Sequence, residues 1–298
     1  MPPEHPPTLD PAAAARWPRR APPRSPWLHD EVARRMAERL EWIRLQPQAW
    51  AHWSPLRGGL AAQELLEKRY PSARCLLVEP DPARAAETRQ LLGRAWWQRW
   101  SGPAREVVAM VPDGAVQMLW ANMALHFAAG PQQLMAQWHR ALATDGFLMF
   151  SCFGPDTARE LRALYAALGW GPSGPEFTDM HDWGDMLVAG GFAEPVMDME
   201  RITLTWDSPA KLLAELRELG ANLHPGRFPA LRGRRWRDRL HEELASRLRG
   251  PDGRLAITFE IVYGHAIRPA PRVRMQASTS IPVDDLRGLL RGGPRPPR

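Results

Sequence analysis

The sequence has few of the residues on which secreted folds, metal sites and export signals depend. Its 298 residues include two cysteines, Cys75 and Cys152, and both fall in short apolar segments that we expect to be buried strands. No group of cysteines and histidines has metal-site spacing, and no continuous apolar segment for export begins the chain. These features predict a cytoplasmic protein with reduced thiols, no metal and no membrane partner.

Lysine is also scarce, so nearly all of the positive charge is arginine. Lys+Arg total 39 against 33 Asp+Glu, which gives a net charge of +6. The arginines are densest near the two ends and between Arg232 and Arg239, and such clustering favours an acidic partner. Codon bias is the alternative, because abundant Arg, Ala, Pro and Trp with little Lys is typical of an arginine-rich genome.

Composition divides the chain into three parts. Residues 1–26 are rich in proline and arginine and lack helical or strand periodicity, so we predict a flexible arm that can still cover a site. Residues 269–298 are rich in arginine and proline and are predicted to form a disordered basic tail. Residues 27–268 carry the hydrophobic periodicity and are long enough to bury a full core.

Strand and helix patterns alternate through the first half of this central part. We predict helices at 28–45, 60–70, 82 to about 100 and 131–142, and strands near 50–53, 75–78, 107–109, 116–120 and 147–153. The alternation predicts an α/β fold with a doubly wound parallel sheet. Beyond it we predict helices at 156–168, 179–189 and 208–220, a basic, partly helical segment at 221–250, and strands near 202–206 and 255–263.

The segment 50–80 has the pattern of a nucleotide-type site, namely strand, loop, helix, strand and acidic residue. Glu79 follows the apolar run 75–78, and an acid at the carboxyl end of a second parallel strand can accept hydrogen bonds from both hydroxyls of a ribose. The alternative role for Glu79 is a surface acid before a turn. The loop is poor in glycine, because residues 54–57 precede only the pair Gly58 and Gly59.

Five short motifs then follow in a characteristic order. They are WANMALHF at 120–127, DGFLMFS at 145–151, the pair Glu160-Leu161, LRELGANLHPGR at 216–227 and GRLAITFEIVYGHA at 253–266. In order and spacing, residues 10–268 resemble class I S-adenosylmethionine-dependent methyltransferases. Within that class they resemble the family that makes the methyl ester of malonyl-acyl carrier protein in biotin synthesis.

The resemblance implies a Rossmann-like, seven-stranded, mostly parallel sheet with flanking helices and a helical lid inserted at about 208–250. It implies S-adenosylmethionine as the cofactor and a monomer that acts on a malonyl thioester of acyl carrier protein, with no nucleic-acid partner. The expected cofactor-binding residues are Gly58, Gly59, Glu79 and Asn122, and the expected substrate residues are His126, Asn222, His224 and Arg227.

Purely structural roles remain open for several of these residues. Asn122 and His126 can instead cap the segment after their strand, and His224 and Arg227 can instead lie in a solvated turn. Because a carboxylate acceptor needs no general base, methyl transfer mainly requires orientation of the reactants and exclusion of water. The lack of a Ser/His/Asp or paired-acid constellation therefore fits the resemblance, and it leaves no residue to name as catalytic.

The glycine loop departs from the family pattern D-x-G-x-G-x-G. The acid falls at Ala51, and the three glycines fall at Trp53, Pro55 and Arg57. Bulky side chains and the lost amide of proline predict obstruction beside the methionine portion of a cofactor. The alternatives are a shifted loop that uses Gly58 and Gly59, a non-catalytic descendant that binds the same carrier, and a methyltransferase of another small substrate.

Overall fold

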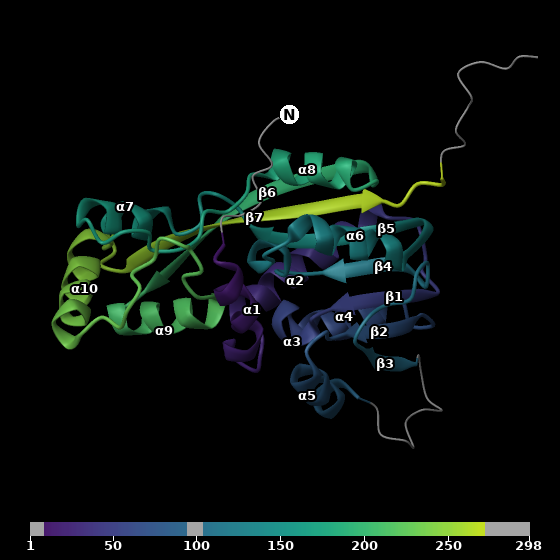
Figure 1. The fold of residues 1–298 in the computed structure, drawn as a ribbon, viewed down its shortest axis with the longest axis horizontal. Coiled ribbons are helices and arrows are strands. Elements are labelled where there is room, and N and C mark those ends of the chain that lie inside the picture. The colour runs from purple at the N-terminus through teal and green to yellow at the C-terminus, as the bar shows by residue number, and fades with distance from the viewer. Residues whose placement is uncertain (1–8, 94–103, 272–298) are drawn as a thin grey trace, which may run out of the picture.

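Seven strands form one sheet in the order β3-β2-β1-β4-β5-β7-β6 in the computed structural model, which describes residues 9–93 and 104–271 (Figure 1). The strands are β1 Ala49–Trp53, β2 Arg74–Val78, β3 Arg105–Val108, β4 Val116–Ala121, β5 Leu142–Phe153, β6 Ala193–Trp206 and β7 Leu255–Ile267. Strand β7 is antiparallel to both of its neighbours, and the other pairings are parallel. The predicted α/β fold with a seven-stranded, mostly parallel sheet is confirmed.

The helices flank this sheet. They are α1 Pro11–Arg20, α2 Trp27–Arg39, α3 Pro55–Gly58, α4 Leu60–Arg69, α5 Pro82–Leu92, α6 Pro131–Ala141, α7 Arg159–Ala167, α8 Met180–Ala189, α9 Pro209–Leu219 and α10 Arg234–Arg247, with short 3₁₀ turns at Leu40–Trp42 and Leu125–Phe127. The predicted helix at 28–45 is α2 with the first of these turns. The end of the helix predicted from 82 to about 100 lies outside the described residues.

Two apolar layers cover the two faces of the sheet. One contains Val32 and Met36 of α2 and Leu66 of α4. The other contains Trp138 of α6 and Trp183 of α8. The inner strands are buried on both faces, which is why they appear in the sequence as unbroken apolar runs.

Helices α9 and α10 lie between β6 and β7, and we call this segment, residues 208–250, the lid. These two strands extend past the carboxyl ends of the parallel strands, and α7, α9 and α10 gather around the extension (Figure 1). Leu212 and Leu219 of α9 and Leu240 and Leu244 of α10 join the same apolar layer as α2. The lid is thus continuous with the core.

The prediction of a flexible arm is wrong for residues 9–26, where α1 forms and packs. Asp10 caps α1 by accepting hydrogen bonds from the backbone N–H groups of Ala12 and Ala13, and Pro11 occupies the first helical position, which favours a helix start. Arg227 of the lid donates to Asp10 Oδ2 at 2.7 Å. Contacts to distant parts of the chain therefore help to hold α1 in place. Residues 1–8 and most of the predicted tail, 272–298, lie outside the described residues.

Candidate functional site

A hollow of about 480 Å³, which we call the strand-end hollow, lies at the carboxyl ends of β1, β2 and β4 beneath α1. Strand β1 pairs with β2 on one side and β4 on the other, so the sheet order reverses here. Ligands of open parallel sheets bind at this kind of switch point. The residues that border it include Trp17, Trp53, Arg57, Glu79, Arg84 and Asn122.

Glu79 lies where the sequence predicted it, directly after β2 and at the wall of this hollow. Its side chain is 4% exposed and accepts a hydrogen bond from Thr88 Oγ1 at 3.4 Å. Burial raises the pKa of Glu79 to about 7, although a hydrogen bond from the backbone of Leu56 and the positive charge of Arg84 act in the opposite direction. A poorly solvated carboxyl that faces a hollow can gain hydrogen bonds from ligand hydroxyls.

Asn122 borders the same hollow, but its side-chain groups already have partners. Its amide donates to the backbone carbonyls of Gly58 and of His29, the latter at 2.8 Å, and its oxygen accepts from Ser151 Oγ at 2.6 Å. These bonds join α2, α3 and β5. The geometry therefore favours a structural role for Asn122 as a bridge between these elements, rather than the predicted cofactor contact or the alternative cap of the segment after β4.

Gly58 and Gly59 are not among the residues that border the hollow. A Cβ atom on Gly58 would lie 2.9 Å from the carbonyl oxygen of Asn122, and one on Gly59 would lie 3.1 Å from the Cβ atom of Ala33. Gly59 also has a φ of +108°, in the region that favours glycine. The pair therefore allows close packing against α2 and β4, and its position does not match the predicted cofactor-binding role.

The three residues that stand in place of the family's glycines reshape the hollow without filling it. The ring of Trp53 packs edge-on against Trp138 of α6, with the centroids 5.9 Å apart. Pro55 begins α3 and is buried. The guanidinium of Arg57 reaches the backbone carbonyls at the end of α9. About 480 Å³ remains, which is within the usual range for small-molecule sites, so the predicted obstruction is at most partial.

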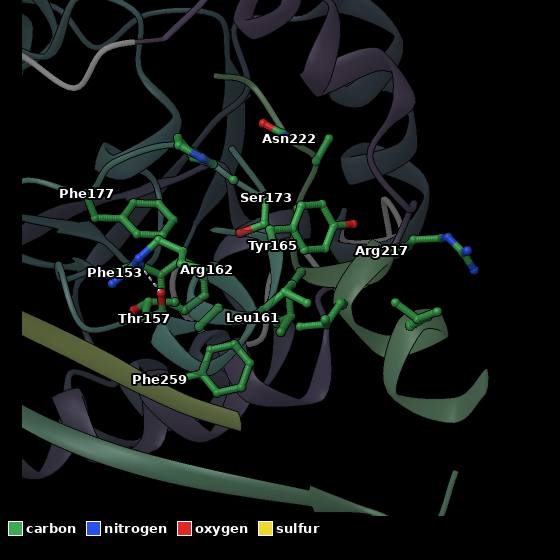
Figure 2. Close-up of a pocket in the computed structure, with 18 of the residues that line it drawn as sticks. Phe153, Thr157, Leu161, Arg162, Tyr165, Ser173, Phe177, Arg217, Asn222 and Phe259 are labelled. Carbon is green, nitrogen blue, oxygen red and sulfur yellow. Dashed lines mark hydrogen bonds between the residues drawn. The ribbon is translucent and has the colours of Figure 1, made fainter. Parts of the chain in front are cut away.

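A second hollow of about 500 Å³, the lid hollow, lies among α7, α9 and α10. Its walls are mainly aromatic and aliphatic and include Phe153, Leu161, Tyr165, Phe177, Leu216 and Phe259. Figure 2 shows several of these side chains gathered around Tyr165, whereas Arg217 extends away from them. Trp17 and Phe127 border both hollows, so the two adjoin at this aromatic pair.

Arg162 is a charged residue within the largely apolar lining of the lid hollow. Its guanidinium donates to the backbone carbonyls of Pro155 and Thr157, in the turn that leads into α7 (Figure 2). Arg162 therefore has a structural role, because it holds the turn before α7. The rest of the lining suits an apolar chain better than a free ion.

One of the four predicted substrate residues, Asn222, borders a hollow. It also braces its own turn, since its amide donates to the carbonyl of Pro172 at 2.8 Å and its oxygen accepts from the backbone N–H of His224 at 3.0 Å. His224 accepts from the backbone N–H of Gly226, and Arg227 pairs with Asp10. Within the described residues, His224 and Arg227 border neither hollow.

His126 is buried and borders neither hollow, although it packs directly behind Phe127 and Phe153 in the wall of the lid hollow. Its ring packs on Phe127 and Phe153, with centroid distances of 4.3 and 4.5 Å, and its Nδ1 accepts from the backbone N–H of Phe153 at 3.3 Å. Burial lowers the pKa of His126 well below its ordinary value, so the ring is neutral. This environment favours the structural role over the predicted substrate contact.

The sequence interpretation missed most of the lid hollow. Tyr165 and Phe177 lie in different segments, and nothing in their local pattern indicates that they share a wall. Trp17, at the junction of the hollows, is an aromatic residue in a segment predicted to be flexible. An isolated tryptophan among alanines and arginines was the one available signal.

No described helix is long and apolar enough to cross a membrane. Within residues 9–93 and 104–271 there is also no group of His, Cys, Asp and Glu side chains placed to hold a metal ion.

Comparison with solved structures defines the class of fold. The YcgJ protein from Bacillus subtilis aligns with a TM-score of 0.53 over 81% of this chain and 99% of its own, at 11% identity. A Bacillus halodurans protein provisionally assigned as a methyltransferase aligns with the same TM-score over 79% of this chain and 99% of its own, at 12% identity. The architecture is therefore that of the Rossmann-like methyltransferase fold.

Sequence comparison is more specific. The malonyl-[acyl-carrier protein] O-methyltransferase of Gallionella capsiferriformans is 39% identical over 262 residues, which cover 85% of this chain and 88% of the relative. The enzyme of the same name from Laribacter hongkongensis is 38% identical over 286 residues, 91% of this chain and 90% of the relative. The chain belongs to the malonyl-[acyl-carrier protein] O-methyltransferase family. No family model matches the sequence.

Proposed function

We propose that this protein transfers a methyl group from S-adenosylmethionine to the free carboxylate of malonyl-acyl carrier protein in biotin synthesis. One observation carries the proposal: a charged hollow at the strand ends adjoins an apolar hollow under the lid, and Trp17 and Phe127 border both. A reaction between a polar cofactor and an acyl thioester needs two such compartments that meet at the reacting atoms.

The strand-end hollow fits the cofactor. Glu79 borders this hollow, which supports a role for it as acceptor of hydrogen bonds from the ribose hydroxyls, and the volume of about 480 Å³ suits a ligand of this size. Arg84 donates to the backbone carbonyls of Pro18, Ala21 and Pro22 and so fixes the end of α1 over the hollow. This roof would keep water from the ligand.

When bound, S-adenosylmethionine would supply an electrophilic methyl group on a sulfonium, for in-line transfer to a carboxylate oxygen of the malonyl group with the neutral thioether as the leaving group. No proton moves, so the residues of the chain have to orient the acceptor and exclude water. The apolar wall of the lid hollow, with Tyr165 and Phe259, suits the thioester arm.

The carrier-docking surface in this proposal is the exposed basic part of α10. Of the arginine cluster Arg232, Arg234, Arg235, Arg237 and Arg239, which we predict to dock an acidic carrier, all but Arg232 are exposed. Arg232 has a different role, because it stacks on Trp236, with its guanidinium carbon 4.5 Å from the ring centroid, and donates to the carbonyl of Trp170. Acyl carrier proteins are acidic as a class, so opposite charges would accelerate encounter.

The free thiols fit the cytoplasmic setting expected for such an enzyme, since Cys75 and Cys152 are both buried and neither forms a disulfide.

A non-catalytic carrier-binding protein is the second candidate, and the loss of the glycine loop at Trp53, Pro55 and Arg57 favours it.

A combined binding and turnover experiment tests the proposal. Malonyl-acyl carrier protein incubated with the protein and S-adenosylmethionine should gain one methyl ester by mass spectrometry, while unloaded carrier should not. Calorimetry should show that S-adenosylhomocysteine binds with an affinity near micromolar. Carrier binding without cofactor binding or methyl transfer would favour the non-catalytic alternative.

A further inference from the structure

Three arginines border the strand-end hollow, and they differ in whether an acidic side chain lies close to the guanidinium. Arg84 donates to backbone carbonyls at the end of α1 and lies 3.8 Å from a carboxylate oxygen of Glu87. Arg19 is largely exposed and lies 3.5 Å from Asp81. Both therefore have an acidic neighbour. Arg57 has none among the described residues.

The guanidinium of Arg57 contacts neutral groups. It donates to the backbone carbonyls of Glu218 at 3.3 Å and Leu219 at 3.4 Å, and it lies 5.4 Å from the centre of the Trp17 ring. Burial and the positive charge of Arg84 lower the pKa of Arg57 to about 10, so the group remains a cation near neutral pH. A partly buried cation without an acidic partner is a favourable site for an anion.

The position of Arg57 in the hollow indicates which part of a ligand it would meet. Glu79 marks the end of β2, where a ribose is expected. Arg57 lies beneath Trp17 and touches the end of α9, which also forms part of the lid hollow. A cofactor whose ribose lies at Glu79 and whose methyl group reaches the junction of the hollows would bring its amino-acid portion close to this guanidinium.

We infer that Arg57 binds the carboxylate of the amino-acid portion of the methyl donor, in place of the backbone N–H groups that a glycine-rich loop would offer. The inference rests on the proposed function and adds a residue to the same site. A guanidinium can form two parallel charge-assisted hydrogen bonds to a carboxylate. Its present contacts are near the long limit for N–H to oxygen bonds, so a carboxylate would replace weak partners with a strong one.

The test compares two ligands that differ at the group Arg57 would hold. S-adenosylhomocysteine carries the amino-acid portion, whereas 5′-methylthioadenosine has the same adenine and ribose without it. Calorimetric titration of the full chain should show that Arg57→Gln weakens S-adenosylhomocysteine binding about 10- to 100-fold and changes methylthioadenosine binding less than about twofold. Arg57→Lys should retain part of the affinity, because it keeps the charge but loses the planar fork.

Arg89→Gln is the matched control. This variant removes the same charge from an exposed position on α5 that does not border the hollow, and it should leave both affinities unchanged. Because the readout is the ratio of two affinities, a general loss of folded protein would lower both and leave the ratio alone.

The outcomes separate this inference from the proposed function. Equal weakening of both ligands, no effect on either, or tighter binding of S-adenosylhomocysteine after Arg57→Gln or Arg57→Gly would overturn the role of Arg57 while the cofactor site stands. Tighter binding would show that Arg57 obstructs the hollow. A wild-type protein that binds neither ligand would overturn the cofactor site and, with it, this inference.

Discussion

The two hollows have nearly the same volume, about 480 and 500 Å³, and both have largely apolar walls, but five charged residues border the strand-end hollow and two border the lid hollow. The charged residues that border the strand-end hollow include Glu79, which follows β2, Arg57 of α3 and Arg84 of α5. The lid hollow is bordered mainly by aromatic and aliphatic side chains such as Tyr165 and Phe259. The contrast indicates that specificity at one hollow depends on ions and hydrogen bonds, and at the other on shape and exclusion of water.

The two hollows also differ in how the chain builds them. The strand-end hollow combines a roof from α1 with short segments that follow β1, β2 and β4, and only those segments lie close to features visible in the sequence. The lid hollow combines the segments 153–177, 213–222 and 236–259, which meet because β6 and β7 extend past the parallel strands. A change in either hollow should therefore affect one ligand more than the other.

The largest effect is expected from a charge placed in the lid hollow. Leu216→Glu puts a carboxylate in an apolar wall, where it has to be desolvated and repels the malonyl carboxylate. We expect kcat/KM for malonyl-acyl carrier protein to fall at least about 100-fold, with S-adenosylhomocysteine affinity within about twofold of wild type. Ala214→Glu adds the same charge on the exposed face of α9 and is the control. Equal losses of turnover and cofactor binding would show that the hollows are not separate.

The reciprocal change is Glu79→Ala in the strand-end hollow. Loss of two charge-assisted hydrogen bonds to ribose should weaken S-adenosylhomocysteine by about 1.5 to 3 kcal/mol, or about 10- to 150-fold. The KM for the malonyl carrier should change less than about threefold. Glu64→Ala, at an exposed position of α4, should have no effect on either quantity. Unchanged cofactor affinity in Glu79→Ala would remove Glu79 from the site.

Acid should weaken cofactor binding through the same residue. Because burial raises the pKa of Glu79 to about 7, about nine-tenths of the free protein carries a protonated Glu79 at pH of about 6. If the ionised form holds ribose, S-adenosylhomocysteine should bind about tenfold more weakly there than at pH of about 8. Calorimetry at both pH values should show this dependence in wild type and little of it in Glu79→Gln.

Stability should change with pH in the opposite direction to cofactor binding. In the free protein the folded state holds the Glu79 proton more tightly than the unfolded chain does, because the pKa rises from 4.5 to about 7. The free energy of unfolding contributed by this group should therefore decline as the pH rises from about 4.5 to 7. Denaturant titrations of wild type and Glu79→Gln should differ in this window, and parallel pH profiles would contradict the raised pKa.

The smallest effect is expected at the docking surface, outside both hollows. Reversing Arg234 and Arg237 to glutamate should slow association with malonyl-acyl carrier protein about 3- to 10-fold at low salt. The difference should shrink at moderate salt, where screening acts over roughly 10 Å. Folding stability should change by less than about 0.5 kcal/mol, since both side chains are exposed.

Surface plasmon resonance at two salt concentrations measures this effect. Reversal of Arg44 and Arg89, which are exposed positions outside the lid, is the charge-matched control. If the control slows association as much as the lid variant does, net charge rather than a defined docking surface is responsible, in line with codon bias as the source of the arginines.

Local pattern was sufficient for the inner strands of the sheet and for the position of Glu79 at its edge. Apolar runs such as 75–78 and 147–153 predicted buried strands, because a strand that is covered on both faces has no solvent-exposed side and therefore few polar residues. The place of Glu79 followed directly, since the residue after a parallel strand must lie at the carboxyl edge of the sheet. The order of strands and helices likewise determined the fold class, because few topologies satisfy that alternation.

Tertiary structure alone decided the roles of the residues between those elements. The sequence could not show that α1 would be held by Arg84 and Arg227, that Gly58 would pack against Asn122 and Gly59 against α2, or that Arg57 would reach the end of α9. Each of these outcomes depends on a partner distant in the sequence, and periodicity reports only which face of an element is buried. Which side chains meet across a hollow is set by how separate elements pack, and that information exists only in the folded chain.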